Sequence, residues 1–323
     1  MKDSVDISVV VPIFNEAENL QELYDRLVKT LAGLEPMSFE LIFVDDGSTD
    51  GGFQRLRELA TADARVRAVR FVRNFGQHVA LSGGIERSRG NVVILMDADL
   101  QNAPEDIPRF IAKIREGYDL VSGWRLNRGE LTFVRRIGSA LMNWFIGLST
   151  GVPLHDYNCG FKAMTRRVAQ EICRYGHLRR YIAPLLARLA RSVAEVPVAN
   201  GSRRQGHSKY TFLQIFALIV EFIIGFSVRP FQVIGLGGVA CTLLGVLAGF
   251  AYFVGRLVFG MAAGDRLLAS IILGTFAGIQ FSILGLLGEY MVRAYHAAQN
   301  LPLYVVEEET GSLSGPRGPS TES

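Results

Sequence analysis

Two long apolar segments near the C-terminal end most constrain how this chain folds. Residues 231–257 carry no charge before Arg256, and residues 267–290 carry none before Glu289. Each segment is longer than the ~20 residues that a helix needs to cross the hydrocarbon core of a bilayer. A pair of buried helices in a large soluble core is the alternative, but two such runs in tandem favour a transmembrane hairpin over residues 230–293.

Charges around the hairpin indicate its orientation. The loop between the two runs holds Asp265 and Arg266, whose charges cancel. The basic residues lie outside that loop: Arg203, Arg204, Lys209 and Arg229 before the hairpin, and Arg293 after it. Because basic flanks tend to stay on the cytoplasmic side, both ends of the hairpin and the domain before it are predicted to be cytoplasmic.

The segment before the hairpin, residues 209–229, is apolar but is interrupted by Gln214 and Glu221. It ends at Arg229–Pro230, where a helix must stop or kink. We interpret it as an amphipathic helix lying in the membrane interface. A third span is the alternative, but it would place Glu221 near the middle of the membrane, which is costly.

Residues 1–208 combine helical and strand periodicity. Leu20, Leu23, Leu27 and Leu31 recur at helical spacing and form one stripe, while short β-branched apolar runs lie on either side. Strands are predicted at 6–15, 39–46, 66–72 and 91–100, and helices at 16–34, 53–63 and 76–90. Strands that alternate with helices form a parallel sheet covered by helices on both faces. The predicted class of this domain is therefore α/β, with a mostly parallel, Rossmann-like sheet.

Polar side chains follow the predicted strands, at the edge where a parallel sheet binds its ligand. These clusters are Asn15–Glu16, Asp45–Asp46, Asn74 and Asp97–Asp99. If the strand in "VVILMDADLQN" stays extended to its end, Asp97, Asp99 and Gln101 point to one side. Neighbouring carboxylates ionise together at low cost only beside a cation, and hard oxygen ligands select Mg²⁺ or Mn²⁺. A solvated turn is the alternative, but the position after an apolar strand favours a metal site.

Composition excludes several functions. With 34 Lys and Arg against 31 Asp and Glu, the net charge of +3 is too small to indicate nucleic-acid binding. The three cysteines, Cys159, Cys173 and Cys241, lack metal-finger spacing and are predicted to be reduced thiols. The hydrophobic fraction of 49% is high for a soluble protein and agrees with membrane attachment.

Several motifs resemble those of a known family. "VVVPIFNEAENL", "IFVDDGSTDGG", "NFGQHVALSGGI" and "MDADLQNAPEDIP" resemble the GT-A glycosyltransferases of family 2. "HDYNCGFKAMTR", "RRQGHSKYTF" and a hairpin ending in "GLLGEYMVRAY" are similar to the polyprenyl-phosphate glycosyltransferases. That group includes bactoprenol glucosyltransferases, undecaprenyl-phosphate formamido-arabinose transferases and, more distantly, dolichyl-phosphate mannose synthase. The resemblance implies a GT-A catalytic domain at residues 1–208, followed by the interfacial helix and the hairpin.

The resemblance implies roles for residues on the donor side. Those expected to bind the nucleotide are Pro12, Asn15, Glu16, Asp45, Asp46 and Gln77. Those expected to hold Mg²⁺ or Mn²⁺ on the diphosphate are Asp97, Asp99 and Gln101. Asp46-Gly47-Ser48 is also typical of a capped turn, and Gln77 of an ordinary helix start.

On the acceptor side, a polyprenyl phosphate needs basic donors at the membrane surface for its anionic head. The candidates are Arg125, Arg135, Arg136, Ser139, Arg203 and Lys209. Arg203, rather than Arg204, matches the family's arginine three residues before the glycine of "RQGHSK". Gly206 and Ser208 in that element suggest a backbone loop that clasps an anion. Arg135 and Arg136 are equally suited to anchoring on anionic lipid.

The resemblance assigns Asp99 and Asp156 as catalytic, with His155 as the rival of Asp156 and packing as its alternative role. Because the second pKa of a phosphate monoester is ~6, the acceptor is already nucleophilic at neutral pH. Catalysis then rests on positioning and on neutralising the departing nucleoside diphosphate, and the alternative role of Asp156 is to orient the acceptor or steer the sugar. Direct attack from the face opposite the leaving group inverts the anomeric centre.

The function expected from the resemblance is transfer of a sugar, glucose from UDP-glucose, onto undecaprenyl phosphate at the bacterial inner membrane. GlcNAc, mannose or a modified arabinose remain open as the sugar. A polysaccharide-type transferase with a sugar acceptor and a non-catalytic binding partner are the other classes considered. Relatives imply a homotetramer. Residues 294–323 are expected to form a cytoplasmic tail that is disordered from Glu307 onward.

Overall fold

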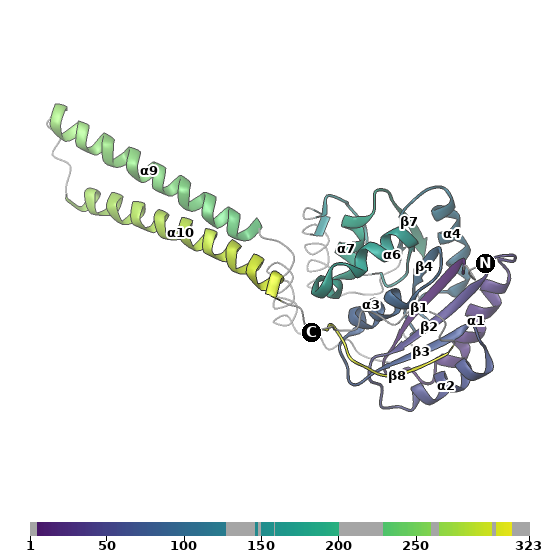
Figure 1. Cartoon of the computed structure of the whole chain (residues 1–323). Helices are drawn as coiled ribbons and strands as arrows, with labels where there is room; N and C mark the ends of the chain where they lie inside the picture. The colour runs from purple at the N-terminus through teal and green to yellow at the C-terminus, as the bar shows by residue number, and fades with distance from the viewer. Residues whose placement is uncertain are drawn as a thin grey trace. The chain divides into compact units, whose positions relative to one another are not determined.

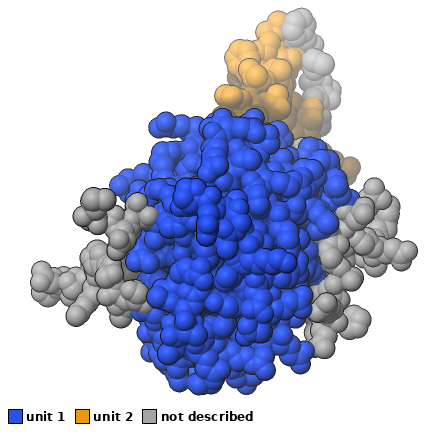
Figure 2. Space-filling view, turned by 90° about the vertical axis from the view of Figure 1, so that its right-hand side faces the viewer, with its two compact units in different colours: residues 1–209, 301–323 blue, residues 210–300 orange. Residues whose placement is uncertain are grey.

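A computed structural model describes residues 5–126, 146–147, 150–157, 159–199, 229–259, 265–298 and 302–311. The chain forms two compact units, coloured separately in Figure 2. One comprises residues 1–209 and 301–323, and the other residues 210–300. The predicted interfacial helix lies, except for Arg229, outside the described residues.

The first unit contains an eight-stranded sheet in the order β7-β5-β6-β4-β1-β2-β3-β8 (Figure 1). The strands are β1 (Ile7–Ile13), β2 (Phe39–Asp45), β3 (Val66–Phe71), β4 (Val92–Leu95), β5 (Leu120–Arg125), β6 (Lys162–Thr165), β7 (Val193–Val198) and β8 (Val306–Thr310). The pairs β1–β2, β2–β3, β1–β4 and β5–β7 are parallel, whereas β6 and β8 run antiparallel to their neighbours. The prediction of a mostly parallel sheet is confirmed.

Helices pack on the two faces of this sheet. They are α1 (Leu20–Ala32), α2 (Gly52–Ala62), α3 (Gln77–Arg87), α4 (Ile107–Arg115), α6 (Arg166–Cys173) and α7 (Ile182–Leu189), with 3-10 turns η1 (Pro104–Asp106) and η2 (Gly176–Arg180). Val9 and Val11 of β1 pack with the leucines of α1 and with α2 and α4, and the predicted stripe is buried. Val10 faces the opposite side, where a Cβ added at Gly84 of α3 would overlap it. Because its side chains alternate between the two faces of the sheet, β1 packs against helices on both sides.

The chain turns soon after β4. The strand ends at Leu95, and Leu100 has a φ of +58°, so the segment from Asp97 to Gln101 is not extended. The expectation that Asp97, Asp99 and Gln101 share one strand face is therefore wrong. Asp97 and Asp99 lie in a turn, because the backbone leaves the sheet after Leu95, before it reaches either carboxylate.

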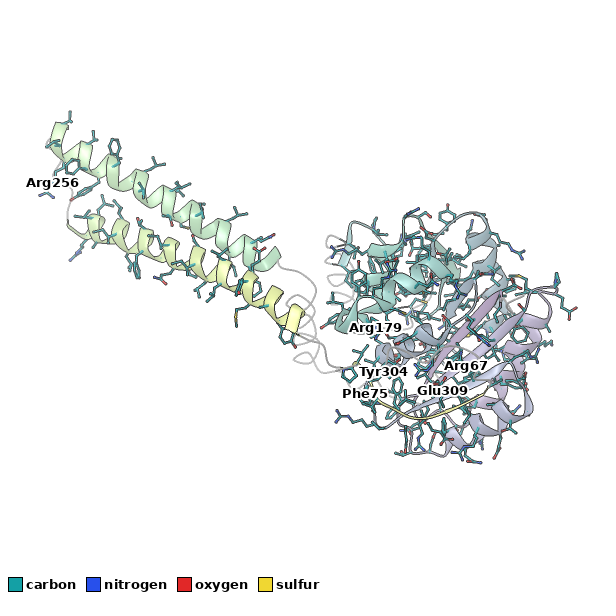
Figure 3. The ribbon with its side chains drawn as sticks, viewed as in Figure 1. Arg67, Phe75, Arg179, Arg256, Tyr304 and Glu309 are labelled. Atoms are coloured by element: carbon teal, nitrogen blue, oxygen red, sulfur yellow. The ribbon has the colours of Figure 1, made fainter. Side chains whose placement is uncertain are left out.

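The described part of the C-terminal tail belongs to the first unit. Residues 306–310 form β8, which pairs antiparallel with β3, so the prediction of disorder from Glu307 is wrong for this stretch. Just before it, Tyr304 stacks on Phe71 of β3, with ring centroids 4.5 Å apart and planes at 18°. Figure 3 shows Tyr304 and Glu309 along this return segment. A segment that follows the hairpin is thereby built into the catalytic sheet.

Ion pairs hold the three glutamates of β8. Glu307 pairs with Arg70 at 3.2 Å, and Glu308 with Arg57 at 2.6 Å. Glu309 accepts from both Arg67 and Arg87 at 3.0 Å. These glutamates, at the start of the tail expected to be disordered, are instead paired with arginines from β3, α2 and α3.

We predict that Glu309→Gln destabilises the catalytic unit more than Glu308→Gln does. The side chains of the two arginine partners of Glu309 are only 11% and 18% exposed. In Glu309→Gln these arginines lose their carboxylate partner, which should lower the free energy of unfolding by about 1–3 kcal/mol. Glu308 pairs with Arg57, which is 43% exposed, and such pairs contribute ~0–1 kcal/mol. Thermal unfolding of the detergent-solubilised full chain measures both. Equal midpoints for the two variants would contradict the ranking.

The second unit contains α9 (Arg229–Phe259) and α10 (Asp265–Ala298). Phe231–Val258 and Arg266–Val292 are long and apolar enough to cross a membrane. The helices approach closely at glycines: a Cβ at Gly238 would lie 2.5 Å from the Ser282 nitrogen, and one at Gly285 2.5 Å from the Gly235 nitrogen. Large apolar side chains cover the outer surfaces. Small residues inside and apolar ones outside fit a helix pair in lipid.

Candidate active site

The carboxyl ends of β1, β2 and β4 lie side by side and carry the predicted donor residues. Ile13, the last residue of β1, is in register with Asp45, the last residue of β2. Asn15 follows β1 with a φ of +56°, and its side-chain oxygen accepts from the Thr49 backbone N–H at 2.9 Å. The loops after β1 and β2 are therefore joined at this edge.

Asp45 and Asp46 have different surroundings. Asp46 accepts backbone N–H bonds from Phe75 at 2.7 Å and Gly76 at 2.8 Å, which fixes the loop before α3. Asp45 is fully buried, and its Oδ2 atom has no hydrogen-bond partner among the described residues. The Arg70 Nε atom lies 3.6 Å from that oxygen. Burial raises the pKa of both carboxyls. Of the two predicted residues, Asp45 is the better placed to accept from a ligand.

Asp97 lies at the centre of the site. Burial, followed by the charge of Asp99, raises the pKa of Asp97 to about 6. Gln77, predicted to approach the nucleotide, donates its amide to Asp97 Oδ1 at 2.5 Å. A Cβ added at Gly160 would overlap the Asp97 carboxylate, so only glycine leaves room for that carboxylate. Two adjacent carboxylates of which one is abnormally basic fit a hard divalent cation.

The other predicted donor residues take supporting positions. Gln101 donates its backbone N–H to Asp99 Oδ1 at 3.1 Å, which shapes the turn after β4. Glu16 accepts from the Asn19 side chain at 2.5 Å just before α1. Pro12 is buried within β1. The ligand contacts assigned to these three residues stay predictions.

Arg125 and Asp156 form a bidentate ion pair. Arg125 Nε lies 2.7 Å from Asp156 Oδ2, and Nη2 lies 3.2 Å from Oδ1. Asp156 is fully buried, whereas the Arg125 side chain is 24% exposed. The predicted base is thus engaged by the predicted phosphate ligand, and a guanidinium on both of its oxygens favours an orienting role. Its role as a base stays a prediction.

Lys162 is a site residue that the sequence did not reveal. It begins β6, is almost fully buried and donates to Ser122 Oγ at 2.8 Å. Burial lowers its pKa, and its charge acts on both Asp97 and Asp156. A lysine inside the apolar run "GFKAM" was the available signal. A buried titratable group with a shifted pKa beside such carboxylates is a candidate functional residue.

Part of the acceptor prediction lies beyond the structural description. Arg135, Arg136, Ser139, Arg203 and Lys209 fall outside the described residues. Their roles at the acceptor phosphate therefore remain expectations from the sequence.

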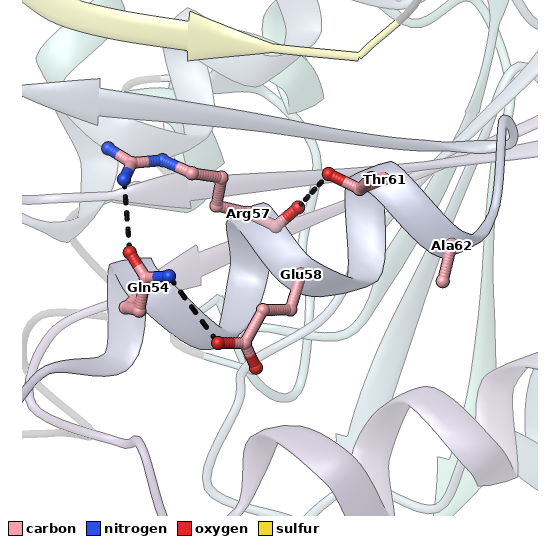
Figure 4. Close-up of a pocket in the computed structure, with 5 residues that line it drawn as sticks. All are labelled: Gln54, Arg57, Glu58, Thr61 and Ala62. Atoms are coloured by element: carbon pink, nitrogen blue, oxygen red, sulfur yellow. Dashed lines mark hydrogen bonds between the residues drawn. The ribbon is translucent and has the colours of Figure 1, made fainter.

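A separate hollow of about 340 Å³ lies on the outer side of α2 (Figure 4). It is lined by Gln54, Arg57, Glu58, Thr61 and Ala62. All five residues belong to one helix, and no predicted site residue is among them. Because ligand sites in such sheets lie at the strand ends, we do not assign this hollow to the active site.

Comparisons with known proteins agree with this geometry. The family model for glycosyl transferase family 2 matches residues 8–173, which include the strand ends, Asp97 and Asp156. The chain belongs to glycosyltransferase family 2. It is therefore a glycosyltransferase, and its α/β unit, with a mostly parallel sheet, has the GT-A fold.

Curated relatives match most of the chain. The undecaprenyl-phosphate 4-deoxy-4-formamido-L-arabinose transferase of Proteus mirabilis (strain HI4320) is 38% identical, covering 94% of both chains. The enzyme of the same name from Klebsiella pneumoniae subsp. pneumoniae is 37% identical, covering 93% of this chain and 92% of that one. The resemblance to polyprenyl-phosphate glycosyltransferases is thereby confirmed.

Solved structures are more distant. Glucosyl-3-phosphoglycerate synthase from Mycobacterium tuberculosis, in complex with Mn²⁺ and UDP-glucose, is 22% identical, with a TM-score of 0.46, over 69% of this chain and 78% of that one. Mannosyl-3-phosphoglycerate synthase from Rubrobacter xylanophilus is 15% identical, with a TM-score of 0.49, over 67% and 72%.

Proposed function

We propose that this chain is a membrane-bound, inverting enzyme that transfers a sugar from a UDP-sugar to undecaprenyl phosphate. The observation that carries the proposal is the pair Asp97–Asp99, whose Asp97 carboxylate packs against Gly160. The same chain has two helices long enough to cross a membrane. The relatives are named for undecaprenyl phosphate, which supports a lipid acceptor. The same names favour 4-deoxy-4-formamido-L-arabinose over glucose as the transferred sugar.

The donor side supports a nucleoside diphosphate with Mg²⁺ or Mn²⁺. Asp97 and Asp99, with Gln101, would hold the ion, which when bound would withdraw negative charge from the leaving diphosphate. Asp45 is fully buried, and its Oδ2 atom lacks a hydrogen-bond partner within the described part of the chain, so it would accept from the base or ribose. Gln77 holds Asp97 in place through its amide. Asp46 would act indirectly, by fixing the loop before α3.

The acceptor side supports attack by a phosphate oxygen without a general base. A phosphate monoester is largely dianionic at neutral pH, so it needs positioning rather than deprotonation. Arg125, held in a fixed orientation by Asp156, has N–H groups left to donate to the phosphate. The hairpin would keep the lipid and this unit at the same membrane, the bacterial inner membrane. A homotetramer stays a prediction.

We predict that removing divalent metal stops lipid-linked transfer. With EDTA, label from a radioactive UDP-sugar should enter organic-extractable product at least ~100-fold more slowly, because the leaving charge is no longer neutralised. UDP-glucose and UDP-4-deoxy-4-formamido-L-arabinose are compared as donors, and Mg²⁺ or Mn²⁺ added in excess of EDTA should restore the rate.

Three results would contradict parts of this proposal. Undiminished transfer in EDTA would exclude a metal role. Label that enters only a water-soluble polymer would favour a sugar acceptor over a lipid. Equal rates with both donors would show that the site does not select the sugar named for the relatives.

A further inference from the structure

The guanidinium of Arg70 lies between carboxylates from two distant parts of the chain. Arg70 on β3 is in register with Asp45 on β2, and β8 pairs with the other edge of β3 (Figure 1). The Arg70 Nε atom lies 3.6 Å from Asp45 Oδ2 and 3.2 Å from Glu307 Oε2. That nitrogen is buried and forms no hydrogen bond to any residue that the structure describes. A carboxylate of the proposed nucleotide site and a carboxylate of the C-terminal tail thus share one cation.

A β-bulge directs Glu307 toward this cation. The register of β8 on β3 shifts next to Arg70, which lies opposite Glu308, and Glu307 is the extra residue at the shift. In a regular strand Glu307 and Glu308 would point to opposite faces of the sheet. Both instead pair with arginines, Arg57 and Arg70, that lie over the ring of Phe53. Because bulges re-aim side chains, the contact of Glu307 with Arg70 follows from the backbone of β8.

The two oxygens of Asp45 differ in what they contact. Oδ1 accepts the backbone N–H of Ser48 at 3.0 Å, whereas Oδ2 is the atom proposed to bind the nucleotide. At 3.6 Å the Arg70 Nε atom is too far from Oδ2 for a hydrogen bond, but its charge still opposes the burial that raises the pKa of Asp45. The guanidinium therefore favours the ionised carboxylate without occupying its acceptor atom.

We propose that Glu307 is a positioning residue for the donor nucleotide, because it restrains Arg70 and so keeps Asp45 Oδ2 open to an N–H or O–H group of the base or ribose. This inference rests on the proposed function, in which Asp45 accepts from that group. Without the charge of Glu307, the guanidinium is drawn onto Asp45, since charge-assisted bonds between arginine and carboxylate are strong. A strand that follows the membrane hairpin then contributes to nucleotide affinity.

The test measures nucleotide binding to the detergent-solubilised full chain by calorimetry in Mg²⁺. The ligands are UDP, N3-methyl-UDP, which lacks the N–H donor of the base, and 2′,3′-dideoxy-UDP, which lacks the hydroxyls of the ribose. The variants are Glu307→Gln, which removes the charge, and Glu307→Asp, which keeps it on a shorter side chain. Glu308→Gln is the matched control, because Glu308 is the next residue of β8 and pairs with Arg57 instead.

We expect Glu307→Gln to raise the Kd of UDP about 10-fold, which is the loss of one hydrogen bond to a charged acceptor. Glu307→Asp should raise it less, and Glu308→Gln should leave it unchanged. The increase should shrink for the analogue that lacks the group bound by Asp45, which distinguishes base from ribose. In transfer assays the KM of the UDP-sugar should rise while kcat and the KM of the acceptor stay level.

A double-mutant cycle tests whether Glu307 acts through Arg70. Arg70→Gln removes the cation that Glu307 restrains, so adding Glu307→Gln to that variant should weaken UDP binding no further. Thermal midpoints identify any variant that unfolds. If Glu307→Gln does so, Glu307→Asp carries the comparison, with a smaller rise in the Kd of UDP than the 10-fold expected for loss of the charge.

An unchanged Kd of UDP in folded Glu307→Gln would overturn the inference and leave the transferase standing. An undiminished increase with both analogues would also overturn it, since Asp45 would then contact neither group. So would an equal further loss in the Arg70→Gln background, or an equal increase in Glu308→Gln. A parent that binds no UDP would contradict the proposed donor itself, and with it the nucleotide that this inference assigns to Asp45.

Discussion

Asp99→Asn is expected to abolish sugar transfer without destabilising the protein. Burial and then the charge of Asp99 raise the pKa of Asp97, as expected of two neighbouring carboxylates that repel each other. Removing one charge relieves that repulsion, so the thermal midpoint should stay level or rise. The proposed metal loses an anionic ligand, and kcat/KM should fall about 10²–10³-fold. Opposite directions of change in activity and stability are typical of functional residues.

Steady-state transfer across a Mg²⁺ or Mn²⁺ titration, with thermal unfolding in EDTA, measures both effects. Asp25→Asn is a matched control, because Asp25 only accepts from Gln21 on the surface of α1 among its described hydrogen bonds. Its rate and midpoint should equal those of the parent. A parental rate in Asp99→Asn would remove the central support for a metal at this edge. A clearly lowered midpoint would show that the carboxylate is structural.

Sequence patterns predicted the helices and strands of the first half of the fold, because these elements follow from the spacing of apolar residues that are close in sequence. The leucine stripe from Leu20 to Leu31 can be buried only on one face of a helix, and β1 and β2 are mostly apolar and buried along their whole length. A strand covered on both faces reads as such a run. The clustering of the predicted nucleotide-binding residues at one edge of the sheet followed from the alternation of strands and helices, since parallel strands bring their carboxyl ends together.

The rest depended on partners distant in sequence. The glutamates of β8 resemble a solvated tail until Arg67 and Arg87 are placed beside them. The turn after β4 arises at Leu100, where a left-handed φ is not readable from an ordinary leucine. The distinction between Asp45 and Asp46 likewise needs the loop that folds back from β3. Long-range charge compensation and unusual backbone angles are therefore what the sequence left open.

Separating Arg125 from Asp156 should produce the largest loss of stability in this site. Asp156 is fully buried and both its oxygens contact the guanidinium. Asp156→Asn would remove the carboxylate paired with Arg125 and leave its guanidinium close to the buried charge of Lys162. Breaking a buried pair on one side costs ~3–5 kcal/mol. For a unit of this size, each kcal/mol corresponds to about 2–4 °C in the midpoint.

A double-mutant cycle separates this loss from catalysis. In Arg125→Gln/Asp156→Asn the orphaned charge is gone, so much of the stability should return while transfer stays low. Glu171→Gln, whose pair with the 75%-exposed Arg174 lies on the surface of α6, should shift the midpoint hardly at all. Additive losses in the cycle would mean that the pair is not coupled. If Asp156→Asn is assayed below its midpoint and transfers at the parental rate, Asp156 is neither a base nor needed to orient Arg125.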